Sequence, residues 1–187
     1  GLMLLGFPWG LPLCALWACA PWLISRLEVP YDARKPEIDR QEFMDIARAT
    51  WRYFDMAVSD TGLPADNIQI EPTCPRQSRT SPTNIGLYIA ACAAAWRLEV
   101  ASPEDALGRV EKTVSTLEKM EKWKGQLYNW YDIDTLAPLE PRYVSSVDGG
   151  NLAASLICAA EAFREMDLPL SRRMIRLAEE MRFEALF

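Results

Sequence analysis

Histidine is absent from the 187-residue sequence, and cysteine is scarce and scattered. Without histidine, the chain can form no His-based metal site and no Ser-His or Cys-His nucleophile pair of its own. The 5 cysteines include no C-x-x-C pair, and their odd number argues against a disulfide framework or a zinc site. We therefore expect no metal or other cofactor, and any acid–base chemistry has to rest on carboxylates.

Basic residues are outnumbered by acidic ones. The sequence has 20 Lys and Arg against 26 Asp and Glu, which gives a net charge of −6. This is the wrong sign for binding a phosphate backbone, and no basic stripe with interleaved aromatic rings occurs. The composition therefore predicts that nucleic acid is not a partner.

Charge is missing altogether from the start of the chain, where no residue from Leu2 to Ile24 is an Asp, Glu, Lys or Arg. Such a run can cross a bilayer core of ~30 Å, so we predict a transmembrane helix in contact with membrane lipid over residues 1–25. A secretory signal fits less well, because the run exceeds the usual ~7–15 residues and lacks a basic start. A buried core helix conflicts with three prolines. A linker follows over 26–37, and its basic residues place the soluble part on the cytoplasmic side of the inner membrane.

The remainder of the chain has helical periodicity. Amphipathic segments over 38–58, 102–123 and 171–187 alternate with apolar, alanine-rich segments over 82–100 and 151–163. Ser81 and Ser102, each followed by proline, are the expected N-caps of two of these helices. No segment has a convincing strand pattern. We expect Trp51, Phe54 and Trp123 in the core, with Cys92 and Cys158 as small buried hydrophobes.

This alternation predicts an all-α fold, a partial α/α toroid over residues 38–187 in which outer amphipathic helices surround inner apolar ones. A TPR-like or HEAT-like solenoid is the alternative, but its repeats are similar in length and joined by short turns. Here the connections 59–84 and 125–151 are long, and both precede an inner helix. They therefore gather at the N-terminal ends of the inner helices, where free N–H groups and the positive end of the dipole face a ligand.

The second long connection is rich in aromatic rings and hydrogen-bonding groups. Loops over about 12–15 residues are usually functional or disordered, and disorder goes with few aromatic residues. We therefore interpret 125–151 as a functional loop.

Three segments carry a family resemblance: "LPADNIQIEP" (63–72), "RTSPTNIGLY" (79–88) and "LYNWYDIDTLAPLEPRYVSSVDGGNLA" (127–153). They resemble the glucoamylase-like central domain of cyclic β-1,2-glucan synthases. The resemblance spans roughly residues 40–187. Ala65 and Gly149 depart from it, since the family more often has Pro and Ser at these positions.

The resemblance implies part of a membrane-bound enzyme that makes cyclic β-1,2-glucan. This domain would handle the β-1,2-glucan chain by retaining transglycosylation. It also implies an incomplete domain, because a family toroid has six helical hairpins and its best-placed catalytic acids lie further downstream. We therefore expect the fragment alone to be inactive, with the missing remainder of the same polypeptide as its partner.

A transglycosylase that forms a covalent intermediate needs two carboxyl groups ~5–5.5 Å apart. Asp132 and Asp148 are the catalytic candidates, although Asp148 is expected rather as a helix cap and Asp132 equally as a turn-former. The predicted substrate-binding residues are Asp66, Asn67, Arg79, Thr80, Asn84, Asn129, Trp130, Tyr131, Asp132 and Arg142.

Alternatives remain open for several of these residues. Trp130 and Tyr131 are adjacent in an extended segment, so one is expected in the core and the other exposed. Arg79 and Arg142 either bind glucan or brace the loops through acidic partners. For the whole chain, the rival hypothesis is a non-enzymatic helical-repeat scaffold that binds a protein partner through its aromatic loop.

Overall fold

The computed structural model describes residues 10–27, 38–69, 71 and 76–186 and divides the chain into two units, Gly1–Ile38 and Asp39–Phe187. The first unit contains α1 (Gly10–Leu27), which has Pro21 in its interior and Arg26 above the ring of Trp22. Of the membrane helix predicted over residues 1–25, the described part is helical from Gly10 onward, and residues 1–9 and most of the predicted linker lie outside the described residues. Among the described helices, none has the length and apolar character needed to cross a membrane. The membrane location and its orientation stay predictions.

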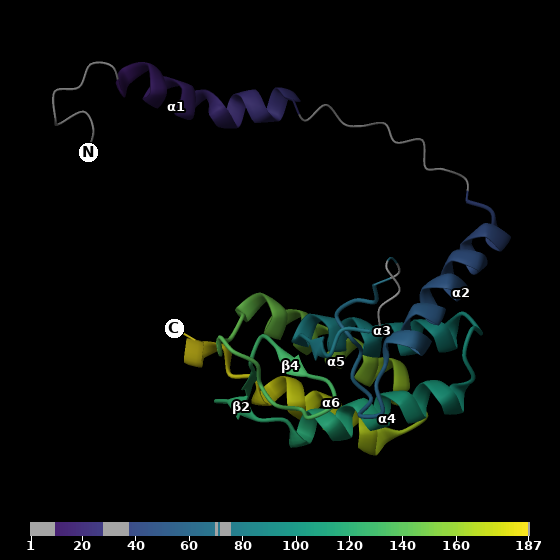
Figure 1. The fold of residues 1–187 in the computed structure, drawn as a ribbon. Coiled ribbons are helices and arrows are strands. Elements are labelled where there is room, and N and C mark those ends of the chain that lie inside the picture. The colour runs from purple at the N-terminus through teal and green to yellow at the C-terminus, as the bar shows by residue number, and fades with distance from the viewer. Residues whose placement is uncertain (1–9, 28–37, 70, 72–75, 187) are drawn as a thin grey trace. The chain divides into compact units, whose positions relative to one another are not determined.

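The described residues of the second unit include five α-helices, which are drawn in Figure 1. The first is α2 (Arg40–Ala57), which begins where the Asp39 carboxylate accepts hydrogen bonds from the backbone N–H groups of Gln41 and Glu42. Its second half buries Trp51, Phe54 and Ala57. α2 is therefore an outer helix, fixed to the unit by its C-terminal turns.

The inner helices are α3 (Pro82–Arg97) and α5 (Ser146–Phe163), and they pack directly against each other. Small residues allow a close approach: a Cβ atom at Gly86 of α3 would lie 3.1 Å from the Cα atom of Leu152 in α5. At the other end of the pair, the rings of Trp96 and Phe163 stack with centroids 5.3 Å apart. These two helices form the centre of the hydrophobic core.

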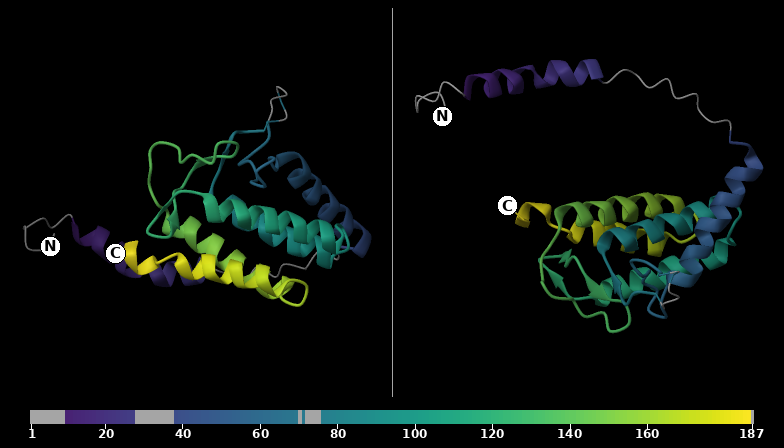
Figure 2. Two further views of the ribbon diagram at one scale, coloured as in Figure 1. Left: turned by 90° about the horizontal axis from the view of Figure 1, so that it is seen from below. Right: turned by 45° about the horizontal axis from the view of Figure 1, so that its top comes forward.

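The outer helices α4 (Pro103–Lys119) and α6 (Leu168–Glu180) cover the inner pair, with α4 against α3 and α6 against α5. Figure 2 shows the four helices running side by side in two layers. Ser81 and Ser102 are the N-caps of α3 and α4, which confirms two sequence predictions. The mostly helical architecture with alternating inner and outer helices is also confirmed.

Four two-residue strands correct the expectation of no strands. β1 (Arg79–Thr80) pairs antiparallel with β4 (Tyr131–Asp132), and β2 (Lys122–Trp123) pairs antiparallel with β3 (Gln126–Leu127). The short 3-10 helix η2 (Phe183–Leu186) follows α6. Two burial predictions were also wrong: Trp123 is 38% exposed in the β2–β3 hairpin, and Cys158 is exposed on α5, whereas Cys92 is buried.

The contact between α4 and α6 gives a testable pH dependence. Arg173 donates to both carboxylate oxygens of Glu118, at 3.0 and 2.8 Å, and lowers the pKa of Glu118 below its ordinary value. A folded pKa below the unfolded value stabilises the protein above the unfolded value of about 4.3, and this contribution is lost as the pH falls through the folded pKa.

We expect Glu118→Gln to reduce stability at pH 7 and to make the acid-induced loss of stability below about pH 4.3 shallower than in the wild type. Urea unfolding followed by circular dichroism between pH 3 and 7 measures both effects. Glu165→Gln, at an exposed carboxylate beyond the end of α5, is the control. Parallel pH profiles for Glu118→Gln and the wild type would contradict the prediction.

Candidate polar site at the inner-helix N-termini

The two long loops meet through the strand pair β1–β4. Arg79 lies opposite Asp132 and Thr80 opposite Tyr131, and the backbone N–H of Ile133 donates to the Ser78 carbonyl at 2.8 Å. These pairings join segments that are about fifty residues apart in the chain. Because β1 leads directly into α3 and the loop after β4 leads into α5, the joined loops lie over the first turns of both inner helices (Figure 1).

A first polar cluster is centred on Asp66. Its carboxylate accepts hydrogen bonds from the Arg79 guanidinium at 3.2 Å, the Asn84 amide at 3.0 Å and the Asn67 amide at 3.1 Å. The Asp66 side chain is 22% exposed, whereas Arg79 is 47% exposed. Four residues predicted from the sequence to bind substrate are therefore brought together. One carboxylate positions the three donor groups, and the cluster is partly exposed to solvent.

Trp130 connects this cluster to a second one. The Arg79 guanidinium lies over the indole ring, 4.4 Å from its centroid, so one face of the ring is covered by a cation. With the Asn129 amide oriented so that its donor and acceptors are all satisfied, the Trp130 Nε1–H donates to the Asn129 oxygen at 2.8 Å. Trp130 thus holds both Arg79 and Asn129 in place, the first over its ring and the second at its indole nitrogen.

The second cluster is centred on Asp148 in the first turn of α5. In the same orientation, the Asn129 amide donates to one oxygen of the Asp148 carboxylate at 3.0 Å, and the Tyr143 hydroxyl donates to the Asn129 oxygen at 2.7 Å. The Thr83 hydroxyl of α3 donates to the other Asp148 oxygen at 2.6 Å. The result is one continuous chain of contacts from Asp66 to Asp148 across the N-termini of both inner helices.

The structure corrects the expectation that Asp148 caps its helix. The N-cap of α5 is Ser145, whose hydroxyl accepts from the Asp148 backbone N–H at 3.2 Å, and the helix begins at Ser146 rather than at Asn151. The Asp148 carboxylate is consequently free to accept hydrogen bonds from side chains. It does so in the first turn of α5, close to the positive end of the helix dipole.

Two of the residues predicted to bind substrate lie beneath the site. Thr80 and Tyr131 have no exposed surface. The Tyr131 hydroxyl donates to the Glu121 carbonyl at 2.6 Å and accepts from the Tyr128 N–H at 2.8 Å, and burial raises the pKa of Tyr131 far above its ordinary value. Both side chains pack beneath the loop, and a role of either in ligand binding stays a prediction. Of the adjacent pair, Tyr131 is the core residue, whereas Trp130 is half-buried, so the expectation of one core and one exposed ring is confirmed only for the core ring.

Asp132 and Arg142 have partners within their own loop. One oxygen of Asp132 accepts from the backbone N–H groups of Asp134 at 3.1 Å and Thr135 at 2.8 Å, and these bonds lower the pKa of Asp132. Arg142 pairs with Glu121 at 3.1 Å and Glu140 at 3.2 Å. Asp132 therefore forms a turn and Arg142 braces the loop, which were the alternative roles open for each residue. A role of either residue in ligand binding stays a prediction.

Three residues of the network were not predicted: Thr83, Tyr143 and Asn151, whose amide donates to the Thr83 hydroxyl at 3.0 Å. Thr83 and Asn151 are polar residues in the first two turns of helices that are mostly apolar further along. That contrast is a sequence signal that could have identified them.

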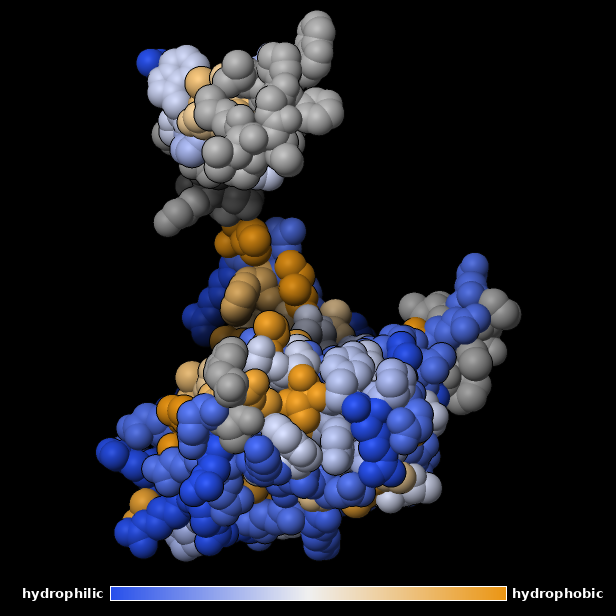
Figure 3. Space-filling model, turned by 90° about the vertical axis from the view of Figure 1, so that its left-hand side faces the viewer, coloured by the Kyte–Doolittle hydropathy of each residue, from blue (hydrophilic) through white to orange (hydrophobic). Residues whose placement is uncertain are grey.

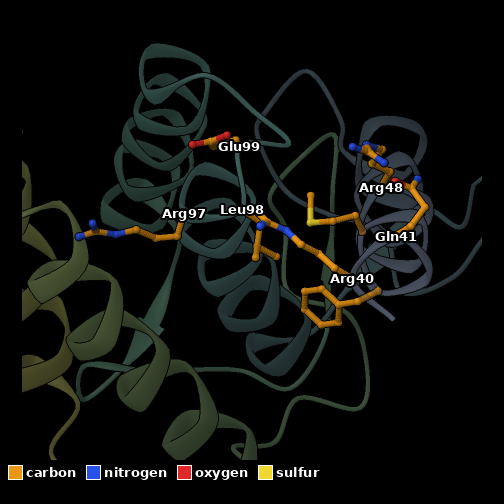
Figure 4. A pocket seen from close by; sticks show the side chains of 8 residues that line it. Arg40, Gln41, Arg48, Arg97, Leu98 and Glu99 are labelled. Carbon is orange, nitrogen blue, oxygen red and sulfur yellow. The ribbon is translucent and has the colours of Figure 1, made fainter. Parts of the chain in front are cut away.

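Figure 3 views the unit from the side on which β2 and β4 lie in Figure 1, where hydrophilic residues predominate and hydrophobic residues form patches between them. A separate cleft of 710 Å³ lies between α2 and the C-terminal end of α3, lined by Arg40, Arg48 and Arg97 among others. Figure 4 shows that Arg97 points away from the two α2 arginines, so these cations do not converge on a common ligand position.

Comparison with known proteins places the chain in a family. The family described as "Protein of unknown function (DUF3131)" matches residues 45–167, which is well over half of the chain. The chain belongs to the DUF3131 family. This DUF3131 chain is also 41% identical over 167 residues to the cyclic β-(1,2)-glucan synthase NdvB of Rhizobium meliloti (strain 1021), a match over 86% of this chain and 6% of NdvB. The resemblance to cyclic β-1,2-glucan synthases drawn from the sequence is thereby confirmed.

Solved structures share the fold of the DUF3131 chain. The endo-β-1,2-glucanase from Chitinophaga pinensis superposes with a TM-score of 0.69 at 21% identity, over 75% of this chain and 36% of that one. A glucoamylase-like protein from Bacteroides caccae gives a TM-score of 0.69 at 20% identity, over 78% of this chain and 38% of that one. At these identities the similarity shows the fold alone, that of the glucoamylase-like α/α toroids. The chain spans little more than a third of each.

Proposed function

We propose that the Asp66–Asp148 network forms part of a groove that binds a β-1,2-glucan chain. We further propose that this segment belongs to a longer carbohydrate-active enzyme that makes cyclic β-1,2-glucan. The observation that carries the proposal is the 41% identity to NdvB combined with the position of the network, which joins both inner-helix N-termini in that segment. Sugar hydroxyls both donate and accept hydrogen bonds, and the network offers amides, carboxylates and a guanidinium within one continuous surface.

The proposed role in chemistry is to hold the glucan for retaining transglycosylation by the whole enzyme. That reaction needs one carboxyl as nucleophile and another as acid and base. Asp66 accepts from three donors, and Asp148 accepts from Thr83 and Asn129, so both carboxylates are held in place by side chains. We propose that they orient donors toward the glucan rather than react.

Incubation of this chain with linear β-1,2-glucan should therefore yield no cyclised or shortened products by mass spectrometry.

Binding is tested by isothermal titration calorimetry of the chain with linear β-1,2-glucan oligosaccharides. We expect saturable binding to the wild type and an affinity lower by about tenfold or more for Arg79→Met, because hydrogen bonds to a charged group typically contribute roughly 1.5–3 kcal/mol. Arg79 is half-exposed, so its replacement should leave the fold intact. Arg164→Met at the opposite end of α5 is the matched control, because Arg164 is 59% exposed and pairs with Glu161.

A folded wild-type chain that binds no oligosaccharide would refute the proposal and leave the scaffold hypothesis standing. Equal losses for Arg79→Met and Arg164→Met would show that the site has been assigned to the wrong residues.

A further inference from the structure

Gln126 stands out because its side-chain amide is buried without a hydrogen-bond partner. The residue lies in β3 and has no exposed surface, and within the described residues neither its Oε1 nor its Nε2 atom has a partner. An unpaired buried amide is unfavourable, because it loses its bonds to water and gains none in return. The role of Gln126 in this fold therefore has to come from the shape and the position of its side chain.

The amide of Gln126 packs against the first turn of α5. A Cβ atom at Gly149 would lie 2.5 Å from the Gln126 Oε1 atom, closer than real Cβ atoms approach. At the next position, Gly150, a Cβ atom would meet nothing within 4 Å. Alanine at 149 would therefore have to displace the end of the Gln126 side chain, which is itself fully buried between β3 and the helix.

The same loop contacts the neighbouring residue of α5 as well. The Asn129 amide, three residues beyond Gln126, donates to the Asp148 carboxylate at 3.0 Å. Residues 126 and 129 thus contact residues 149 and 148 side by side, one by packing and one by a hydrogen bond. The first turn of α5 is held at two adjacent points by one segment.

The hairpin that carries Gln126 is itself fixed to α6. Gly125 has a φ of +85°, which glycine adopts without strain, and a Cβ atom there would collide with the carbonyl oxygen of Glu180. The hairpin turn therefore sits directly on the backbone at the end of α6. Gln126 is held between this anchor and α5.

We infer that Gln126 is a positioning residue that sets the place of Asp148 by packing against Gly149. It acts through its shape, since its amide has no hydrogen-bond partner among the described residues, and its consequence for ligand binding rests on the proposed glucan site. The prediction is that filling the space at 149 displaces the α5 first turn, and that removing the Gln126 side chain in the same protein restores it.

The experiment compares four variants of the full chain: Gly149→Ala, Gly150→Ala, Gln126→Met and the double variant Gln126→Ala with Gly149→Ala. Backbone-amide hydrogen exchange of residues 145–152 reports the first turn of α5 without any ligand. Calorimetric titration with linear β-1,2-glucan oligosaccharides reports the site. Gly150→Ala is matched to Gly149→Ala, because both place a methyl group in the same turn and differ in whether it meets Gln126.

We expect Gly149→Ala to exchange faster in this turn and to bind about tenfold more weakly, with Gly150→Ala close to the wild type. The double variant should recover most of both losses. Gln126→Met, which keeps the length of the side chain and removes its polar atoms, should match the wild type in both measurements.

Each contrary outcome has a distinct meaning. Equal exchange in Gly149→Ala and the wild type, or no recovery in the double variant, would overturn the positioning role whether or not the chain binds glucan. Weak binding by Gln126→Met with normal exchange would overturn it too, because the amide would then act through its polar atoms. If the wild type binds no oligosaccharide, the glucan proposal fails while the exchange data still decide the role of Gln126.

Discussion

Replacing Phe163 by alanine should be among the most destabilising single changes in the chain. Phe163 has no exposed surface, and its ring stacks on Trp96 with an interplanar angle of 19°. Truncating a buried phenylalanine removes the transfer free energy of the ring and leaves a cavity, at a cost of about 3–5 kcal/mol. For a protein of this size, each kcal/mol lowers Tm by about 2–4 °C. We expect a large shift of the urea midpoint and of the calorimetric Tm.

Two further variants make this prediction specific. Phe163→Leu keeps most of the buried volume and should lose much less stability than Phe163→Ala. Phe43→Ala removes the same atoms from the first half of α2, where the side chain is 48% exposed, and should change stability by no more than about 0.5 kcal/mol. Similar losses for Phe163→Ala and Phe43→Ala would mean that the Trp96–Phe163 stack is not part of the stabilising core.

The start of a helix could be predicted where the sequence signal for it lies in a few neighbouring residues. Ser81 and Ser102 each precede a proline, and a serine side chain can cap a helix whatever surrounds it, so the starts of α3 and α4 follow from a few neighbouring residues. The start of α5 was predicted five residues too late, because two adjacent glycines suggested a loop. Gly149 belongs to the helix and packs against Gln126, which is a contact between distant segments.

Non-local pairing also explains why the strands β1 and β4 were not predicted. They have two residues each, too short for a periodic pattern, and they form because Arg79 and Thr80 pair with Asp132 and Tyr131.

Trp123 was expected in the core as a ring of an outer helix. It lies in a tight hairpin instead, where its ring is covered by Lys124 with the ammonium nitrogen 4.5 Å from the centroid.

For the site, the residue types could be predicted and their partners could not. An acidic partner for Arg79 was one of the alternatives, but only the fold shows that the Asp66 carboxylate accepts from both Arg79 and Asn84. Trp130 was predicted to bind substrate, and only the fold shows that Arg79 covers one face of its ring. Such arrangements depend on side-chain directions in loops, which carry no periodicity in the sequence.

Gly86→Ala should destabilise the protein although alanine is the better helix former. A Cβ atom at this position of α3 would lie 2.9 Å from the Ser155 Oγ atom, 3.1 Å from the Leu152 Cα atom and 3.2 Å from the Asn151 carbonyl oxygen. The last two are backbone atoms of α5, which cannot move aside as a flexible side chain can. We expect a net loss of about 1–3 kcal/mol, the usual cost of overpacking a tight contact, measured by urea unfolding.

Gly108→Ala on α4 is the matched control, because a Cβ atom there would meet nothing within 4 Å. It should stabilise the protein by about 0.5–1 kcal/mol, the normal gain from replacing a glycine inside a helix. The two variants make the same chemical change, so stability changes of opposite sign would separate the effect of the close contact between α3 and α5 from that of helix propensity.

The close contact between α3 and α5 also affects the site, since Gly86 lies one turn after Thr83, whose hydroxyl donates to Asp148 across the same pair of helices at 2.6 Å. Gly86→Ala should therefore weaken oligosaccharide binding as well, and Gly108→Ala should leave it unchanged. If Gly86→Ala instead stabilises the chain as much as Gly108→Ala does, the inner helices are further apart than the structure has them, and the link from Thr83 to Asp148 fails with them.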